Sequence, residues 1–192
     1  DEQLAGLVVD EDFQNEIETL KRQYNGSDKN NLVLSHGDLH PGSVMIKNAS
    51  GKMKIIDPEF TVYGPPGLDV GSLLSGYVLA AVHQAYSKQE QCVTPICESI
   101  DAIWNSYIQA MQKGGIDAQT IKAIEVQTVG FTVAEVCRTA LEFAGDRKWL
   151  QFDDQTVKTK AKMAALKIVQ NCMVERHQGG MALLISEVKA IV

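Results

Sequence analysis

About two thirds of this chain is patterned for α-helix almost without interruption. After the Gly/Pro-rich stretch 63–67 the pattern becomes helical and stays helical to the end. Gly114-Gly115 and Gly179-Gly180 mark breaks, because glycine pairs favour backbone conformations that end a helix. A further candidate interruption is Gly130, within the longest helix. We expect helices at about residues 68–87, 93–113, 117–145, 154–175 and 180–191.

The remaining patterns lie ahead of this helical part. Two short strand-like runs, 44–46 and 53–56, are separated by the turn residues 48–51, which is typical of a β-hairpin. The sequence therefore predicts an α+β, mainly α-helical fold in which a small β-hairpin with loops precedes a helical bundle. Before the hairpin we expect a helix over 9–24, a loop over 24–31 and a short apolar run over 32–34.

Composition restricts the class of protein. With 192 residues, of which 45% are hydrophobic, the chain can bury one substantial core, so we expect a single domain over 1–192. No stretch approaches the roughly 20 apolar residues of a membrane span, and we expect no membrane partner. A net charge of −6 argues against a nucleic-acid partner, because phosphate backbones require clustered Lys and Arg.

The cysteines indicate a reducing compartment. They stand at irregular spacings without a C-x-x-C pair, so neither zinc ligation nor a disulfide framework is predicted. We expect reduced thiols in a cytoplasmic protein. The four cysteines are Cys92, Cys97, Cys137 and Cys172.

The loop before the hairpin carries the most informative chemistry. Asp38 lies between an apolar run and a hairpin, where a carboxylate can orient a hydroxyl and take its proton during attack on a phosphoryl group. Asp57 and Glu59 flank a proline at the end of the second strand. On an extended chain, residues two apart point the same way, so both carboxylates can face one Mg²⁺ ion.

Other interpretations of these residues are available. His36, Asp38 and His40 have the spacing of a hydrolase metal triad, and an isolated Asp-Pro-Glu is usually only a turn. The order of base loop, hairpin and carboxylates favours phosphoryl transfer, because protein kinases place a catalytic loop before a metal-binding Asp in the same order.

The segment 36–69 reads HGDLHPGSVMIKNASGKMKIIDPEFTVYGPPGLD. Its two signatures, H-G-D-L-H-x-G-S and I-D-P-E-F followed by Y-G-P-x-G-x-D-x-G, are closely similar to those of methylthioribose kinases. These enzymes belong to the aminoglycoside-phosphotransferase and choline-kinase branch of the kinase-like fold. The resemblance is strong over about 35 residues and weaker over the helical remainder. It implies the C-terminal lobe of a protein-kinase-like fold, with the hairpin beside the catalytic loop.

The resemblance also implies roles for the loop residues. Asp38 would be the catalytic base, and Asp57 and Glu59 would bind Mg²⁺ together with ATP. Ser43 and His40 would help to hold phosphate or substrate. The broader family usually has Asn at the position of Ser43. Methylthioribose kinases share the replacement of this Asn. At the position of Pro41, relatives more often have Thr.

Two further residues have implied roles with simpler alternatives. Asp69 would accept backbone N–H groups of the catalytic loop, and capping of its own helix is the alternative. Arg138 would hold the sugar, although the family commonly has an adjacent Arg pair there, and a solvated or ion-paired Arg is the alternative. We interpret Trp104 and Trp149 as core aromatics rather than a sugar-stacking platform.

A complete kinase also needs a glycine-rich strand-loop-strand and a phosphate-pairing Lys. Neither occurs here, and the 35 residues ahead of His36 are too few for a five-stranded lobe. The chain begins Asp1-Glu2-Gln3 without Met. We therefore expect a segment that lacks its N-terminal nucleotide-binding lobe and is inactive in isolation.

Three functions fit these observations. The first is transfer of the ATP γ-phosphate to 5-methylthioribose, giving 5-methylthioribose 1-phosphate in methionine salvage. The second keeps the chemistry but uses another small sugar or amino alcohol as acceptor. The third is a non-catalytic binding module, against which the intact carboxylates argue. The sequence does not specify the oligomeric state, although relatives are often homodimers.

Overall fold

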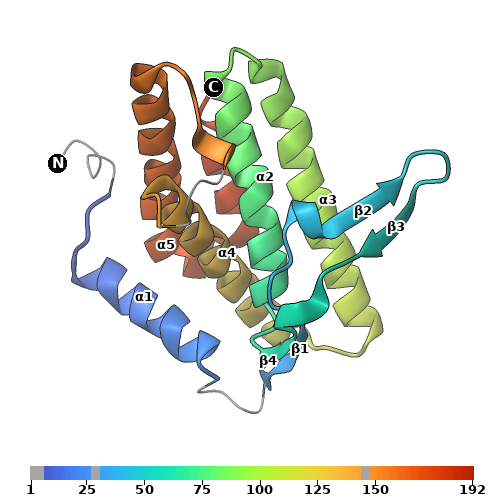
Figure 1. Cartoon of the computed structure of the whole chain (residues 1–192). Helices are drawn as coiled ribbons and strands as arrows, with labels where there is room; N and C mark the ends of the chain where they lie inside the picture. The colour runs from blue at the N-terminus through green and yellow to red at the C-terminus, as the bar shows by residue number, and fades with distance from the viewer. Residues whose placement is uncertain (1–6, 27–30, 144–147) are drawn as a thin grey trace.

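A computed structural model describes residues 7–26, 31–143 and 148–192, with the side chain of Lys148 left out. Within these ranges, five α-helices form the body, and two separate two-stranded antiparallel ribbons lie at one side of it (Figure 1). The helices are α1 (Glu11–Tyr24), α2 (Leu68–Tyr86), α3 (Val93–Lys113), α4 (Ala118–Ala140) and α5 (Gln155–Lys189). The strands are β1 (Val33–Ser35), β2 (Val44–Lys47), β3 (Lys52–Ile55) and β4 (Val62–Gly64). Short 3₁₀ turns are η3 (Pro41–Ser43), η4 (Pro58–Phe60), η5 (Glu90–Cys92) and η6 (Lys148–Leu150).

The expected hairpin is present. β2 and β3 pair with Val44 opposite Ile55 and Lys47 opposite Lys52, and the ribbon projects from the helical body in Figure 1. The second ribbon was not predicted. β4 falls in a stretch expected to be a loop, yet it pairs with β1, with Val33 opposite Gly64. Strands of three residues have too little alternation to be recognised alone, so only the pairing identifies them.

The helix boundaries confirm most of the expected layout and correct two points. α4 ends at Ala140 rather than near residue 145, and Glu142 beyond it has a positive φ of 64°. α4 also continues through Gly130 without interruption. A Cβ atom at Gly130 would lie 2.7 Å from a methyl group of Leu20, so this glycine permits close packing and does not break the helix. The expected break at Gly180 is confirmed, because its φ of 53° and ψ of −144° kink α5.

The core lies between α2, α4 and α5. Leu74, Val78 and Val82 on α2 are completely buried, as are Val133 on α4 and Leu184 on α5. Burial of such side chains contributes about 1.5–3 kcal/mol each and is the main stabilising term.

Both tryptophans belong to this core, as expected. Trp104 is buried, and Trp149 is half-buried and packs against the core. Across the ranges that the structure describes, no helix is long and apolar enough to cross a bilayer.

An ion pair connects the first helix, α1, to the last, α5. Arg176 on α5 is only 1% exposed, and its guanidinium lies 2.5 Å from Glu16 on α1. Burial lowers the pKa of Arg176, and the negative charge of Glu16 opposes that shift. Removing Glu16 would leave the buried guanidinium of Arg176 without its counter-charge, so the pair favours docking of α1 at this position.

Candidate active site

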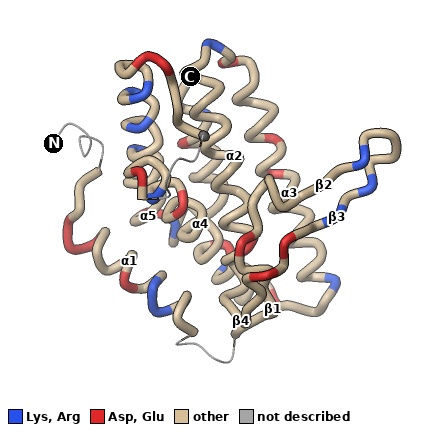
Figure 2. Tube along the Cα trace, in the orientation of Figure 1, with Lys and Arg blue, Asp and Glu red and all other residues tan. Residues whose placement is uncertain are grey.

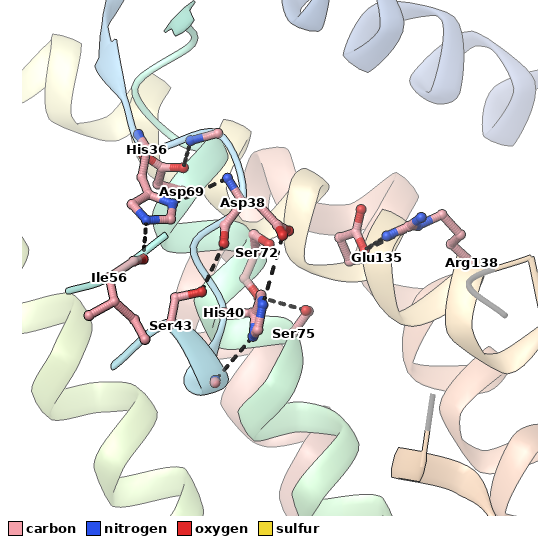
Figure 3. A network of polar contacts seen from close by, with 12 residues as sticks. His36, Asp38, His40, Ser43, Ile56, Asp69, Ser72, Ser75, Glu135 and Arg138 are labelled. Atoms are coloured by element: carbon pink, nitrogen blue, oxygen red, sulfur yellow. Dashed lines mark hydrogen bonds and ion pairs between the residues drawn. The ribbon is translucent and has the colours of Figure 1, made fainter. Parts of the chain in front are cut away.

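The loop that carries Asp38 is anchored to the first turn of α2. Asp69 accepts two backbone hydrogen bonds from this loop, one from the N–H of His36 at 2.5 Å and one from the N–H of Gly37 at 2.9 Å (Figure 3). The N-cap position of α2 is occupied by Gly67, which provides no side-chain cap. The carboxylate of Asp69 is therefore directed at the loop, in the geometry that the resemblance implies, and it does not occupy the capping position.

The N-terminal end of α2 is itself held by neighbouring helices. The N–H of Gly67 donates to the side-chain oxygen of Gln127 on α4 at 2.7 Å, and the Tyr107 hydroxyl on α3 donates to the carbonyl of Pro66 at 3.0 Å. Burial, and secondarily the charge of Asp69, raises the pKa of Tyr107, so its hydroxyl stays protonated and able to donate. Neither side chain could be predicted from the sequence, because neither belongs to a local motif.

His36 joins the Asp38 loop to the segment after β3. Its Nε2 lies 2.8 Å from the carbonyl oxygen of Ile56, and its Nδ1 accepts from the N–H of Asp38 at 3.4 Å. Gly37 has a φ of 86°, and a Cβ atom there would collide with the backbone of Phe60. These contacts place the loop directly against the segment that contains Asp57 and Glu59.

Ser43 also connects the Asp38 loop to the segment after β3. Its side chain is 1% exposed, and its hydroxyl donates to the carbonyl of Asp38 at 3.1 Å. Its own carbonyl accepts the N–H of Ile56 at 3.0 Å. In this structure Ser43 therefore holds the backbone of the loop, and its hydroxyl is turned away from solvent.

Asp57 and Glu59 lie just beyond the hairpin, and both side chains are exposed. Among the described residues, neither carboxylate has a hydrogen bond or ion pair. Figure 2 shows acidic segments gathered where the stretch after β3 meets the loop after β1. Hard, unpaired carboxylate oxygens are what Mg²⁺ requires of a protein, so these two residues fit the expected metal.

The backbone corrects one step of the sequence argument. β3 ends at Ile55, Asp57 has a left-handed φ of 60°, and Pro58–Phe60 form a 3₁₀ turn. The two carboxylates therefore do not alternate along an extended strand, and that reason for their facing one ion is wrong. A left-handed non-glycine residue is uncommon, and such backbone conformations concentrate at functional sites.

The described part of the chain contains no cluster of three or more His, Cys, Asp and Glu side chains that could hold a metal ion. A protein site with only two carboxylates matches the way Mg²⁺ binds with substrate phosphates and water.

Arg138 lies in the last turn of α4 and is ion-paired. Its guanidinium contacts Glu135 at 2.7 Å through Nη2 and at 3.2 Å through Nε. The two side chains are drawn on α4 to one side of the Asp38 loop in Figure 3. The guanidinium thus adopts the ion-paired arrangement that was the alternative to holding a sugar.

Comparison with known proteins decides the family. A model of the choline/ethanolamine kinases matches residues 3–138, well over half of the chain, and this stretch includes the Asp38 loop, the hairpin and most of α4. The chain belongs to the choline/ethanolamine kinase family. Its fold is accordingly the C-terminal lobe of the kinase-like fold that this family shares, as the sequence resemblance implied.

Within the wider family, the chain is similar to methylthioribose kinases. It is 27% identical over 160 residues to the methylthioribose kinase of Geobacillus kaustophilus, which covers 76% of this chain and 38% of that protein. It is 28% identical over 149 residues to that of Bacillus cereus strain B4264, covering 71% and 36%. For the enzyme of Geobacillus thermodenitrificans the identity is 27% over 159 residues, covering 76% and 39%. The chain thus spans less than two fifths of the length of these relatives.

Proposed function

We propose that this chain is the catalytic lobe of an ATP-dependent small-molecule kinase whose acceptor is 5-methylthioribose. The observation that carries the proposal is the joining of the Asp38 loop to the Asp57–Glu59 segment through His36 and Ile56. Family membership supports phosphoryl transfer, and the relatives named methylthioribose kinase support the acceptor. The product would be 5-methylthioribose 1-phosphate, a step of methionine salvage.

In this proposal Asp38 is the general base. Its carboxylate is half exposed, so an acceptor hydroxyl can reach it. Asp38 takes the hydroxyl proton as the oxygen bonds to the terminal phosphorus of ATP, and the bond between that phosphorus and its bridging oxygen breaks to release ADP. The backbone of Asp38 is held on two sides, by the Nδ1 of His36 and the hydroxyl of Ser43. Positioning of this kind is a large part of catalysis in phosphoryl transfer.

Asp57 and Glu59 would hold Mg²⁺, which neutralises charge on the phosphates when bound. Both carboxylates are exposed and lack protein partners among the described residues, so they are available to a cation without breaking an existing contact. We assign His40 and Ser43 to the loop that surrounds the transferred phosphate, with Ser43 acting through the backbone.

A nucleotide-binding lobe is the partner that this arrangement requires. Of fifteen large hydrophobic side chains that the structure describes as exposed, nine lie between Val33 and Tyr63, on the strands and turns beside the loop. Leu34 and Tyr63, opposite each other in the β1–β4 ribbon, are 68% and 69% exposed. Concentrated apolar surface marks a binding face. We propose that this surface contacts the nucleotide-binding lobe, which the longer relatives have room to contain.

We also propose a cytoplasmic location. The four free cysteine thiols support it, because reduced thiols are usual in that compartment.

A second candidate keeps the chemistry and changes the acceptor. It is favoured by the pairing of Arg138 with Glu135, which leaves the expected sugar-binding guanidinium already engaged. Another small sugar or an amino alcohol would then accept the phosphate.

Both candidates are tested by one experiment. The full-length gene product is incubated with ATP and Mg²⁺ and a panel containing 5-methylthioribose, ribose, choline and ethanolamine, and ADP release is followed. Release that depends on 5-methylthioribose supports the first candidate. Release only with another acceptor replaces it with the second. A folded protein that releases ADP with none of them contradicts phosphoryl transfer.

A further inference from the structure

The ring of His40 is held in one orientation by the turn that follows it. His40 is the N-cap of η3, and its Nδ1 accepts the N–H of Gly42 at 3.0 Å (Figure 3). A nitrogen that accepts a hydrogen bond carries no proton, so the single proton of the neutral ring lies on Nε2. That nitrogen is 3.8 Å from Oδ2 of Asp38.

The orientation is enforced by close packing around the turn. A Cβ atom at Gly42 would lie 2.8 Å from the ring of His40, so the ring rests directly on a glycine backbone. Pro41 packs in the same way against α2, where a Cβ atom at Gly76 would lie 2.6 Å from its ring. The N–H of Ser43 also donates to the carbonyl of His40 at 2.8 Å. His40 is therefore held by the turn that follows it, and that turn packs against α2 through Pro41.

Asp38 has no competing partner for its carboxylate. Within the described residues, its side-chain oxygens make no hydrogen bond, and the Nε2 of His40, 3.8 Å from Oδ2, is the one side-chain nitrogen near them. Both side chains are a little under half exposed, 45% for Asp38 and 44% for His40. The backbone of Asp38 is held by His36 and Ser43, whereas its carboxylate is directed only by His40.

We propose that His40 is a positioning residue that acts through Asp38 and does not bind the acceptor. This inference rests on the proposed kinase function. Neutral His40 donates its Nε2 proton toward Oδ2, which leaves Oδ1 of Asp38 to receive the proton of the acceptor hydroxyl. The separation of 3.8 Å exceeds hydrogen-bond length. Hydrogen bonds of catalytic groups commonly shorten in the substrate complex, and this one does so when the acceptor draws Asp38 into place.

Two substitutions separate the contact with Asp38 from the cap on Gly42. Asn is a good N-cap, and its side-chain oxygen takes the place of Nδ1, so His40→Asn keeps the bond to the Gly42 N–H but has no group where Nε2 was. Gln is longer, so His40→Gln brings an N–H donor to the Nε2 position while giving up the cap. The two substitutions therefore distinguish the two roles. A positioning role predicts the larger kcat loss in His40→Asn, whereas a purely structural role predicts it in His40→Gln.

The kinetic test uses the full-length gene product with ATP, Mg²⁺ and its acceptor. We expect His40→Asn to lower kcat by about 10- to 100-fold, the effect of losing a hydrogen bond to a charged group, with acceptor KM nearly unchanged. His40→Gln should restore most of that loss. A rise in acceptor KM with unchanged kcat would instead make His40 a substrate ligand. A larger kcat loss in His40→Gln than in His40→Asn would make it only a cap. Either result overturns the proposal.

A spectroscopic test is independent of activity. Long-range ¹H–¹⁵N correlation spectra of the chain should show the neutral ring of His40 protonated at Nε2, and an Nδ1-protonated ring would overturn the proposal. The outcomes also separate this inference from the function on which it rests. If the wild-type protein has no kinase activity, both the proposed function and the role of His40 are wrong. If the wild type is active and the His40→Asn variant keeps its kcat, only the role of His40 is wrong.

Discussion

The carboxylate of Asp69, in the first turn of α2, accepts the backbone N–H of Gly37 at 2.9 Å across 32 residues of sequence. A second bond from the N–H of His36 engages its other oxygen. Because α2 is buried in the core at Leu74 and Val78, these two bonds fix the Asp38 loop to the core. The position of Asp38, the proposed general base, is thus set by packing as well as by its own loop.

The first prediction concerns this anchor. Asp69→Ala leaves two partly buried N–H groups without an acceptor, and we expect the free energy of unfolding to fall by about 2 kcal/mol. Urea denaturation of the 192-residue chain measures the change. Asp101→Ala is the matched control, because Asp101 is exposed on α3, and its loss should change stability by less than about 0.5 kcal/mol. Equal effects of the two substitutions would show that Asp69 does not anchor the loop.

The second prediction concerns the general base. Asp38→Asn keeps the size of the side chain but cannot take a proton, so kcat of the full-length gene product should fall by about 10²- to 10⁴-fold. Affinity for ATP and Mg²⁺ should change little, because a base acts mainly in the transition state. Steady-state kinetics and nucleotide titrations measure the two effects. Near-normal turnover in this variant would show that Asp38 is not the base.

The third prediction concerns the metal ligand. Asp57→Asn removes a hard anionic ligand, and we expect the Mg²⁺ concentration for half-maximal activity to rise at least about ten-fold. Asn also tolerates the left-handed backbone at this position, so the fold should be unchanged. Asp153→Asn, at an exposed position before α5, is the control and should leave the Mg²⁺ dependence as it is in the wild type. An unaltered Mg²⁺ dependence in Asp57→Asn would contradict the metal assignment.

The fourth prediction concerns Arg138. If its guanidinium holds the acceptor despite its pairing with Glu135, Arg138→Ala should raise acceptor KM about ten-fold or more and leave ATP KM unchanged. A purely helical ion pair would affect only stability, and by about 0.5 kcal/mol or less. Kinetics and thermal unfolding of the same variant distinguish the two roles. An unchanged acceptor KM would remove Arg138 from the site.

The fifth prediction concerns the chain in isolation. If the adenine pocket lies on the proposed nucleotide-binding lobe, ATP bound to this chain alone loses a few hundred Å² of apolar burial, which is worth several kcal/mol at about 25 cal/mol per Å². We therefore expect residues 1–192 alone to bind ATP weakly, with no turnover of 5-methylthioribose. Titration calorimetry and an ADP-release assay measure both. Efficient turnover by this chain alone would show that no further lobe is needed.

The sequence by itself determined the features that depend on neighbouring residues. The β2–β3 hairpin was predictable because its strands are separated only by a turn, so pattern and turn chemistry lie together. The kink at Gly180 was predictable because glycine relieves the strain of a positive φ. The Asp38 loop and the Asp57–Glu59 segment were recognisable as motifs for the same reason, since each is a short continuous run of residues.

The tertiary structure decided what joins these local pieces. The pairing of β1 with β4 and the bond from His36 to Ile56 connect residues 20 or more positions apart, and such contacts leave no periodic signal in the sequence. Gly130 has the same local preference as a helix-breaking glycine, yet packing against Leu20 keeps it inside α4. Propensity acts on single residues, whereas burial and hydrogen bonding act on the whole chain and outweigh it wherever the two disagree.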